Sequence, residues 1–142
     1  MLRRVIFSIF AFVLTIFLFS GCAKVEDHLG GTWKLETMTA EEPYEVIWYF
    51  RSDQSLVRVC NQFNDTSENA TQVDTAYYTI EDKLTFTAIK IIESQNSSCL
   101  AYVNGFFRVE KITENLLVIT RYKMQDETTG GAYLRREFTR VD

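Results

Sequence analysis

The segment Val46-Ile47-Trp48-Tyr49-Phe50-Arg51 alternates between two series of side chains. Val46, Trp48 and Phe50 form the series that we expect to face a core. Because side chains two residues apart point to the same face of a strand, this period predicts a β-strand. Leu84-Thr85-Phe86-Thr87 repeats the pattern, and helical periodicity is not sustained anywhere after residue 21. The chain therefore reads as all-β.

Eight segments rich in aromatic and β-branched residues follow one another between polar breaks. They predict strands at about 31–38, 44–51, 55–63, 71–80, 83–92, 101–112, 115–123 and 132–141. The breaks between them alternate in length, with long ones after the first, third, fifth and seventh strands. Since alternate connections of an up-and-down sheet lie at opposite ends, this predicts an eight-stranded antiparallel up-and-down barrel with loops around an open mouth.

The first 21 residues have the pattern of a secretory signal peptide. Arg3 and Arg4 precede a largely apolar stretch that is short for a membrane-spanning helix of about 20 residues. The end of the stretch, Phe19-Ser20-Gly21-Cys22, resembles a bacterial lipobox. The resemblance implies lipidation of Cys22, with residues 22–29 as a lipidated tether and residues 30–142 as the barrel domain. An ordinary signal peptide or anchor helix with an incidental cysteine is the alternative.

Composition excludes several classes of function. Without residues 1–21 the chain has 121 residues and a formal charge of −6, so it lacks the clustered positive charge that nucleic-acid binding needs. One His and three Cys leave little material for a metal site, and we expect no metal and no cofactor. His28 lies in the tether without a catalytic pattern around it, and the paired acidic residues fall in the tether or in predicted loops. We expect a monomer that is not an enzyme.

Cys60 and Cys99 remain beyond the expected lipidation site. Export would place them in a compartment that permits disulfides, so we predict a bridge, with two separate thiols as the alternative. Cys60 lies late in the third predicted strand and Cys99 lies in the long break before the sixth, so we expect both to belong to the mouth. On the chain-entropy account, closing a loop of this length contributes roughly 3–4 kcal/mol.

Gly31-Thr32-Trp33, which opens the first strand, resembles the G-x-W motif of lipocalins and related calycins. The whole mature chain is similar in size and opening to compact lipocalin-like lipoproteins of the Bacteroidota. The resemblance implies that Trp33 packs across the closed base of the barrel under an arginine from the last strand. Arg140 is nearer the strand end than Arg136, so we expect it to be that arginine. In the alternative, Trp33 is a core aromatic without such a lid.

Choosing the apolar series of each strand gives a set of candidate pocket residues. They are Tyr44, Trp48, Phe63, Tyr78, Phe86, Val103, Phe107 and Tyr122. The same choice turns Val57 and Val59 inward on the third strand, Leu84 on the fifth, and Leu116 and Val118 on the seventh.

Tyr44, Phe63, Val103 and Tyr122 fall toward the mouth. A rim with tyrosines suits a small ligand that has an apolar body and a polar end. We therefore expect a ligand-binding lipoprotein, anchored by its N-terminal lipid to the outer membrane and facing the periplasm or the cell surface. The alternative is a barrel filled by side chains whose loops contact an envelope protein or glycan, and a protease-inhibitor module is a third, weaker interpretation.

Overall fold

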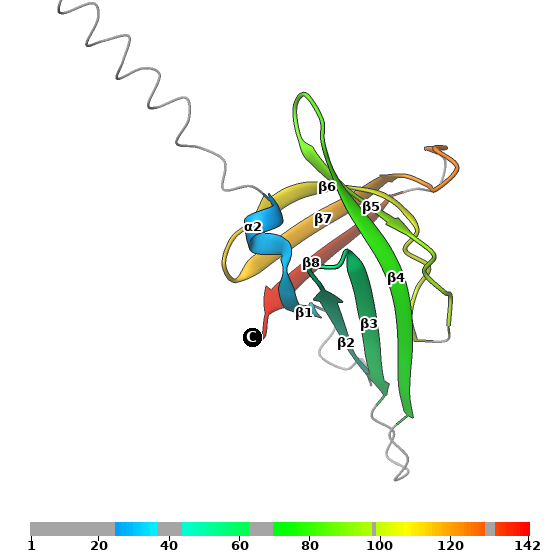
Figure 1. Ribbon diagram of the computed structural model, residues 1–142. Coiled ribbons are helices and arrows are strands. Elements are labelled where there is room, and N and C mark those ends of the chain that lie inside the picture. The colour runs from blue at the N-terminus through cyan, green and yellow to red at the C-terminus, as the bar shows by residue number, and fades with distance from the viewer. Residues whose placement is uncertain (1–24, 37–43, 63–69, 98, 130–132) are drawn as a thin grey trace, which may run out of the picture.

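The computed structural model describes residues 25–36, 44–62, 70–97, 99–129 and 133–142. Its strands form one closed barrel in the order β1-β2-β3-β4-β5-β6-β7-β8, and every neighbouring pair is antiparallel. The all-β, eight-stranded up-and-down barrel expected from the sequence is confirmed (Figure 1). Among the described residues, no helix is long and apolar enough to span a membrane.

The strands follow the predicted segments with shifted ends. They are β1 (Gly31–Leu35), β2 (Tyr44–Phe50), β3 (Ser55–Gln62), β4 (Ala70–Asp82), β5 (Thr87–Ile92), β6 (Gly105–Ile112), β7 (Leu116–Lys123) and β8 (Leu134–Arg140). A short helix, α2 (Val25–Leu29), precedes β1, and its first turn carries Glu26 and Asp27, whose charges suit a helix N-terminus. Strands β1, β3, β5 and β7 run toward one end of the barrel, which is called here the long-connection end, and the short connections after β2, β4 and β6 lie at the other end, together with α2.

Directly paired residues show which side chains point inward. Trp33 pairs with Trp48, Trp48 with Arg58, and Arg58 with Asp74, so these four side chains share the inner face of β1 to β4. Across the closing seam, Trp33 also pairs with Arg140. The barrel interior is therefore defined by register around its whole circumference.

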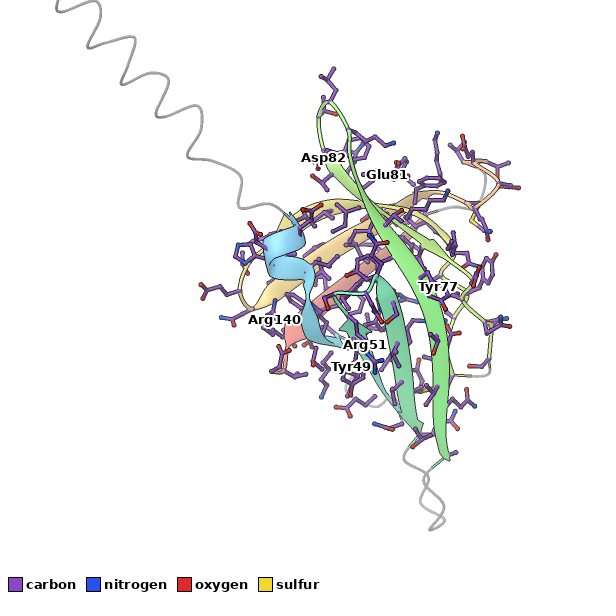
Figure 2. All side chains as sticks on the ribbon, in the orientation of Figure 1. Tyr49, Arg51, Tyr77, Glu81, Asp82 and Arg140 are labelled. Carbon is purple, nitrogen blue, oxygen red and sulfur yellow. A yellow bond between two sulfur atoms is a disulfide. The ribbon has the colours of Figure 1, made fainter. Side chains whose placement is uncertain are left out.

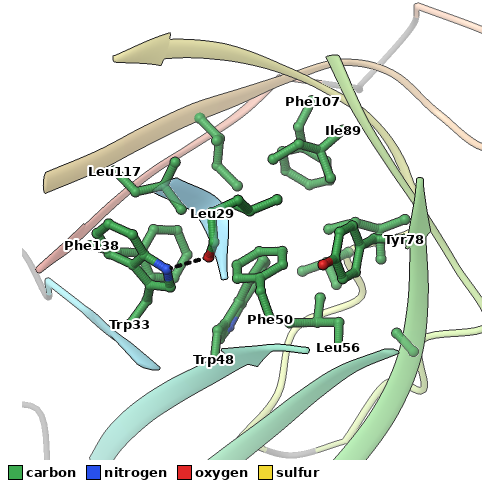
Figure 3. Close-up of a cluster of buried hydrophobic side chains, with 14 of the residues drawn as sticks. Leu29, Trp33, Trp48, Phe50, Leu56, Tyr78, Ile89, Phe107, Leu117 and Phe138 are labelled. Atoms are coloured by element: carbon green, nitrogen blue, oxygen red, sulfur yellow. Dashed lines mark hydrogen bonds between the residues drawn. The ribbon is translucent and has the colours of Figure 1, made fainter. Parts of the chain in front are cut away.

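Large apolar side chains fill the closed half of the barrel (Figure 3). Trp48 packs against Phe138 with ring centroids 4.8 Å apart, and Phe50 meets Tyr78 edge to face at 5.2 Å. Leu29, at the end of α2, is only 1% exposed, and its carbonyl oxygen accepts the indole N–H of Trp33 at 2.8 Å. Because α2 closes the base in this way, an opening can lie only at the long-connection end of the described barrel.

The inward orientation predicted for β3 and β7 is wrong. Leu56, Arg58 and Cys60 face the interior of β3, so Val57 and Val59 point outward. The inward side chains of β7 are those of Leu117, Ile119 and Arg121. The side chains of Leu116, Val118 and Tyr122 therefore point outward. On both strands an arginine belongs to the inner series, and a choice based on apolarity alone selects the other series.

The fifth predicted strand starts too early. Residues 83–86 form the tip of the β4–β5 hairpin, which projects beyond the barrel in Figure 1. Leu84 is fully exposed there instead of lying near the base, and the inner side chains of β5 are Ile89 and Ile91. The predicted sixth strand also begins early, since residues 101–104 belong to the connection before β6.

Candidate functional site

A cavity of about 440 Å³ opens at the long-connection end of the barrel. Strands β1, β2, β3 and β8 form its wall on one side, and the connection between β5 and β6 (residues 93–104, the β5–β6 connection) forms the other. The described residues that line it are Leu35, Glu36, Tyr44, Val46, Trp48, Arg58, Cys99, Leu100, Ala101, Val103, Arg135, Arg136 and Glu137. This volume lies within the range of small-molecule sites, roughly 300–1,000 Å³.

The apolar wall of the cavity comes from the inner faces of β1 and β2. Leu35, Val46 and Trp48 lie at alternating inward positions, and Tyr44 continues the same series where β2 begins. Trp48 is only 1% exposed, and it joins the wall to the packed core through Phe50 and Phe138. This wall is suited to an apolar ligand body.

The β5–β6 connection is fastened inside the mouth. The predicted disulfide between Cys60 and Cys99 is present, with Cα atoms 6.2 Å apart, inside the usual range of about 4.4–6.8 Å. The backbone N–H of Cys99 donates to Gln72 Oε1 at 3.2 Å, and the side chain of Asn104 accepts the N–H of Ser94 at 2.8 Å. These contacts hold Leu100, Ala101 and Val103 against the cavity.

Arg58 is 1% exposed and lies between the cavity and the core. Its Nε donates to Asp74 Oδ2 at 2.8 Å, and its Nη2 forms an ion pair with the same oxygen. Nη1 donates to the carbonyl oxygen of Ala101 at 2.7 Å, and Nη2 also donates to that of Gln95 at 3.1 Å. Burial lowers the pKa of the Arg58 guanidinium and Asp74 raises it, but an arginine stays protonated throughout.

Two further arginines of the inner face lie in the same half of the barrel. Arg121 donates from Nη1 to the carbonyl oxygens of Tyr102 and Asn104 at 3.1 and 3.3 Å. Arg136 pairs with the inward Ile119 across β7 and β8, and it lines the cavity. Burial is the largest cause that lowers the pKa values of Arg58 and Arg121. The positive charge of Arg136 lowers both pKa values further, so Arg136 lies near both guanidiniums.

The sequence-based pocket candidates separate into four groups. Tyr44, Trp48 and Val103 line the cavity. Tyr78 and Phe107 are buried in the core, and the Tyr78 hydroxyl donates to the carbonyl oxygen of Arg51 at 2.7 Å near the base.

Two of the other three candidates, Phe86 and Tyr122, are not among the residues that line the cavity. Phe86 and Tyr122 meet edge to face on the outer surface, with centroids 5.4 Å apart, so their assignment to a pocket is wrong. The Arg108 guanidinium lies 4.3 Å from the Phe86 ring, which keeps this pair attached to the outer face of β6. Phe63 lies outside the described residues, as does Cys22.

The base has the arrangement implied by the G-x-W resemblance. The guanidinium carbon of Arg140 lies 4.4 Å from the centroid of the Trp33 ring (Figure 2 labels Arg140 beside α2). Arg140 also donates to the carbonyl oxygens of His28, Gly30 and Glu114 at 2.5, 2.9 and 2.7 Å. Gly31 has φ +126°, and a Cβ there would collide with this guanidinium and with Asp142. The base is therefore a structural closure.

Sequence reasoning missed Arg58 as a residue of the mouth, and it considered Arg136 only as an alternative lid over Trp33. Arg58 could have been found from its position, since it lies two residues after Leu56 and two residues before Cys60. Residues two apart on a strand share a face, so Arg58 belongs to an otherwise apolar inner face. Within the described ranges, no group of three or more His, Cys, Asp or Glu could hold a metal ion.

A comparison of the chain with protein-family models finds no match, nor does a comparison with curated proteins or with solved structures.

Proposed function

We propose that this protein is a membrane-anchored, lipocalin-like lipoprotein that binds a small apolar or amphipathic ligand in the barrel mouth. The observation that carries the proposal is the cavity of about 440 Å³ beside Trp48, open at the long-connection end. An apolar body would contact the wall of Leu35, Val46 and Trp48, and a polar end would lie near Tyr44 and the arginines. Removing the apolar ligand surface from water supplies the driving force, roughly 25 cal/mol per Å².

The alternative is a filled barrel whose loops contact an envelope protein or glycan. The closed half of the barrel is indeed packed, but the cavity lies above that packing and is not filled by the described side chains. This weighs against a filled plug and favours ligand binding.

Binding is tested with N-phenyl-1-naphthylamine, a neutral apolar dye whose fluorescence rises when it leaves water. The chain from Ala23 onward is suitable, since the closed barrel and all of its described core lie within residues 25–142. We expect saturable binding that Ala101→Phe weakens, because the added ring enters the cavity. Thr79→Phe, at an exposed position on β4 away from the cavity, is the matched control. Absence of saturable binding, or equal binding by Ala101→Phe, would refute the proposal.

Membrane anchoring rests on Cys22 and its preceding residues. Acyl chains on this cysteine would hold the barrel at the membrane, since each buried CH₂ contributes roughly 0.8 kcal/mol. We expect Cys22→Ser to move the protein from the membrane fraction to the soluble fraction, with Cys99→Ser as a control that keeps Cys22. A Cys22→Ser protein that stays with washed membranes would show that another part of the chain is the anchor.

A further inference from the structure

The tip of the β4–β5 hairpin presents an aliphatic side chain to solvent. Residues 83–86 project beyond the barrel at its closed end, and Leu84 in this tip is fully exposed (Figure 1). Single exposed leucines are common on protein surfaces, so exposure alone assigns no role. Leu84 is distinguished by its position, since it lies at the tip of a projecting hairpin at the end of the barrel that also holds α2.

The hairpin holds Leu84 in this exposed position. The backbone N–H of Lys83 donates to the carbonyl oxygen of Phe86 at 2.8 Å, which closes the turn. The Phe86 ring lies back on the outer face of the barrel, where it meets Tyr122 edge to face and lies 4.3 Å from the Arg108 guanidinium. Of the two apolar side chains in the turn, one is therefore attached to the barrel, and that of Leu84 is left in solvent.

The charged groups of the tip are engaged with neighbouring groups of the same hairpin. Lys83 Nζ forms an ion pair with Glu81 at 2.5 Å, and Asp82 Oδ1 accepts the hydroxyl of Thr87 at 2.9 Å. The tip therefore offers no surplus of positive charge to an anionic surface. A contact made by Leu84 is an apolar contact, driven by removal of its side chain from water.

The expected lipid anchor lies at the same end of the barrel. Helix α2 begins at Val25, three residues after Cys22, and three extended residues reach at most about 11 Å. A lipid on Cys22 would therefore hold the start of α2 close to the bilayer, with the hairpin tip on the same side of the molecule (Figure 1). A second contact made by a tethered protein needs little affinity of its own, because tethering raises the effective concentration to about the millimolar range.

We propose that Leu84 inserts into the surface of the membrane that holds the Cys22 lipid, so that the β4–β5 hairpin is a second point of attachment. This inference rests on the proposed lipid anchoring and adds an orientation of the barrel to it. Two points of contact at the closed end restrict how the barrel turns about its tether. They direct the cavity, which opens at the opposite end, away from the bilayer.

The test places a nitrobenzoxadiazole dye on one introduced cysteine of the full-length, lipidated chain. Leu84→Cys is compared with Val73→Cys, an exposed aliphatic position near the opposite end of β4. The three native cysteines are the expected lipid site and the two disulfide partners, so the introduced thiol is the one that takes the dye.

The labelled proteins are reconstituted in vesicles of dioleoylphosphatidylcholine that contain a phosphatidylcholine spin-labelled near its head group, which quenches the dye on close approach. We expect the dye at position 84 to lose most of its fluorescence and the dye at position 73 to lose little. Because the contact is apolar, the quenching should persist at about 1 M NaCl, where charges are screened within about 3 Å.

A second label separates insertion of Leu84 from mere proximity of the hairpin to the bilayer. With the dye on Thr85→Cys, at the neighbouring exposed position, quenching should be strong while Leu84 is present. Leu84→Asp should reduce this quenching severalfold, because a carboxylate does not enter the bilayer. Val73→Asp is the matched control and should leave the quenching unchanged.

The outcomes separate this inference from the proposed function. If the labelled proteins do not float with the vesicles, the lipid anchoring itself fails, and the inference fails with it. If they float, but the dye at position 84 is quenched no more than the dye at position 73, the anchoring stands and the membrane contact of the hairpin is overturned. The same holds if Leu84→Asp leaves the quenching of the Thr85→Cys dye unchanged.

Discussion

Arg58 is the residue at which the barrel changes from a packed core to a polar mouth. Its guanidinium lies 5.7 Å from the centroid of the Trp48 ring, and Asp74 and two backbone carbonyls take up its donors. Burying such a charge costs several kcal/mol unless partners surround it, so the pair holds β3, β4 and the β5–β6 connection in one arrangement.

Breaking this ion pair should strongly destabilise the fold. Asp74→Asn leaves the Arg58 charge buried without its counter-ion, so we expect a loss of about 3–5 kcal/mol in the free energy of unfolding, measured by urea denaturation. The double change Arg58→Met with Asp74→Leu should recover most of that loss, because it removes both charges together. An Asp74→Asn protein with the wild-type midpoint would contradict the buried pair.

Two phenylalanines test the division between the inner and outer faces. Phe107 is fully buried in the core, and Phe86 is a half-buried residue at the hairpin tip. Phe107→Ala should lower the free energy of unfolding by about 3–5 kcal/mol, whereas Phe86→Ala should cost clearly less. Thermal melts of the two variants measure the difference, and equal losses would mean that Phe86 belongs to the core, as its sequence pattern first suggested.

At the scale of elements, the β5–β6 connection determines the shape of the mouth. It brings Cys99, Leu100, Ala101 and Val103 to the cavity, and the disulfide to Cys60 ties it to β3. The β5–β6 connection therefore contributes both to the stability of the fold and to the geometry of the site.

Removing the disulfide should therefore affect both properties. Replacing Cys60 and Cys99 together by serine should cost about 3–4 kcal/mol on the chain-entropy account and weaken binding of N-phenyl-1-naphthylamine. Denaturation and dye titration of the same sample measure the two effects. Unchanged dye affinity in a folded double variant would show that the connection keeps its place without the bridge.

The elements also show what a sequence can predict. The strand count, the order and the alternation of long and short breaks follow from local patterns, and on β1, β2 and β8 the inner series is the more apolar one. On β3 it is not, because Arg58 faces inward and its stabilising partner Asp74 is 16 residues away on another strand. Tyr122 failed as a candidate for the same reason, since Arg121 takes the inner position.

Part of the candidate site could also be predicted from local sequence patterns. Tyr44 and Trp48 belong to a strand whose alternation is plain, and Val103 was found although it lies before β6. The grouping of Arg58, Arg121 and Arg136 could not be predicted from the sequence, because these residues belong to β3, β7 and β8, which only barrel closure brings together.

At the scale of the whole molecule, the barrel is closed and packed at one end and hollow at the other. Leu29, Trp33 and Arg140 close the base, and the cavity of the described residues opens at the opposite end. The expected lipid tether on Cys22 would leave from the base, since α2 lies there. The mouth would then face away from the attachment point.

The central claim, a ligand held in the mouth, can be tested with the two tryptophans of the chain. Trp48 lines the cavity and Trp33 lies at the closed base, so Trp33→Phe and Trp48→Phe give chains that report on the two ends separately. The measurement is quenching of tryptophan fluorescence by 10-bromodecanol, whose bromine quenches only on close approach. We predict saturable quenching of Trp48 in the Trp33→Phe chain and little quenching of Trp33 in the Trp48→Phe chain. Equal quenching of both, or of neither, would contradict binding in the mouth.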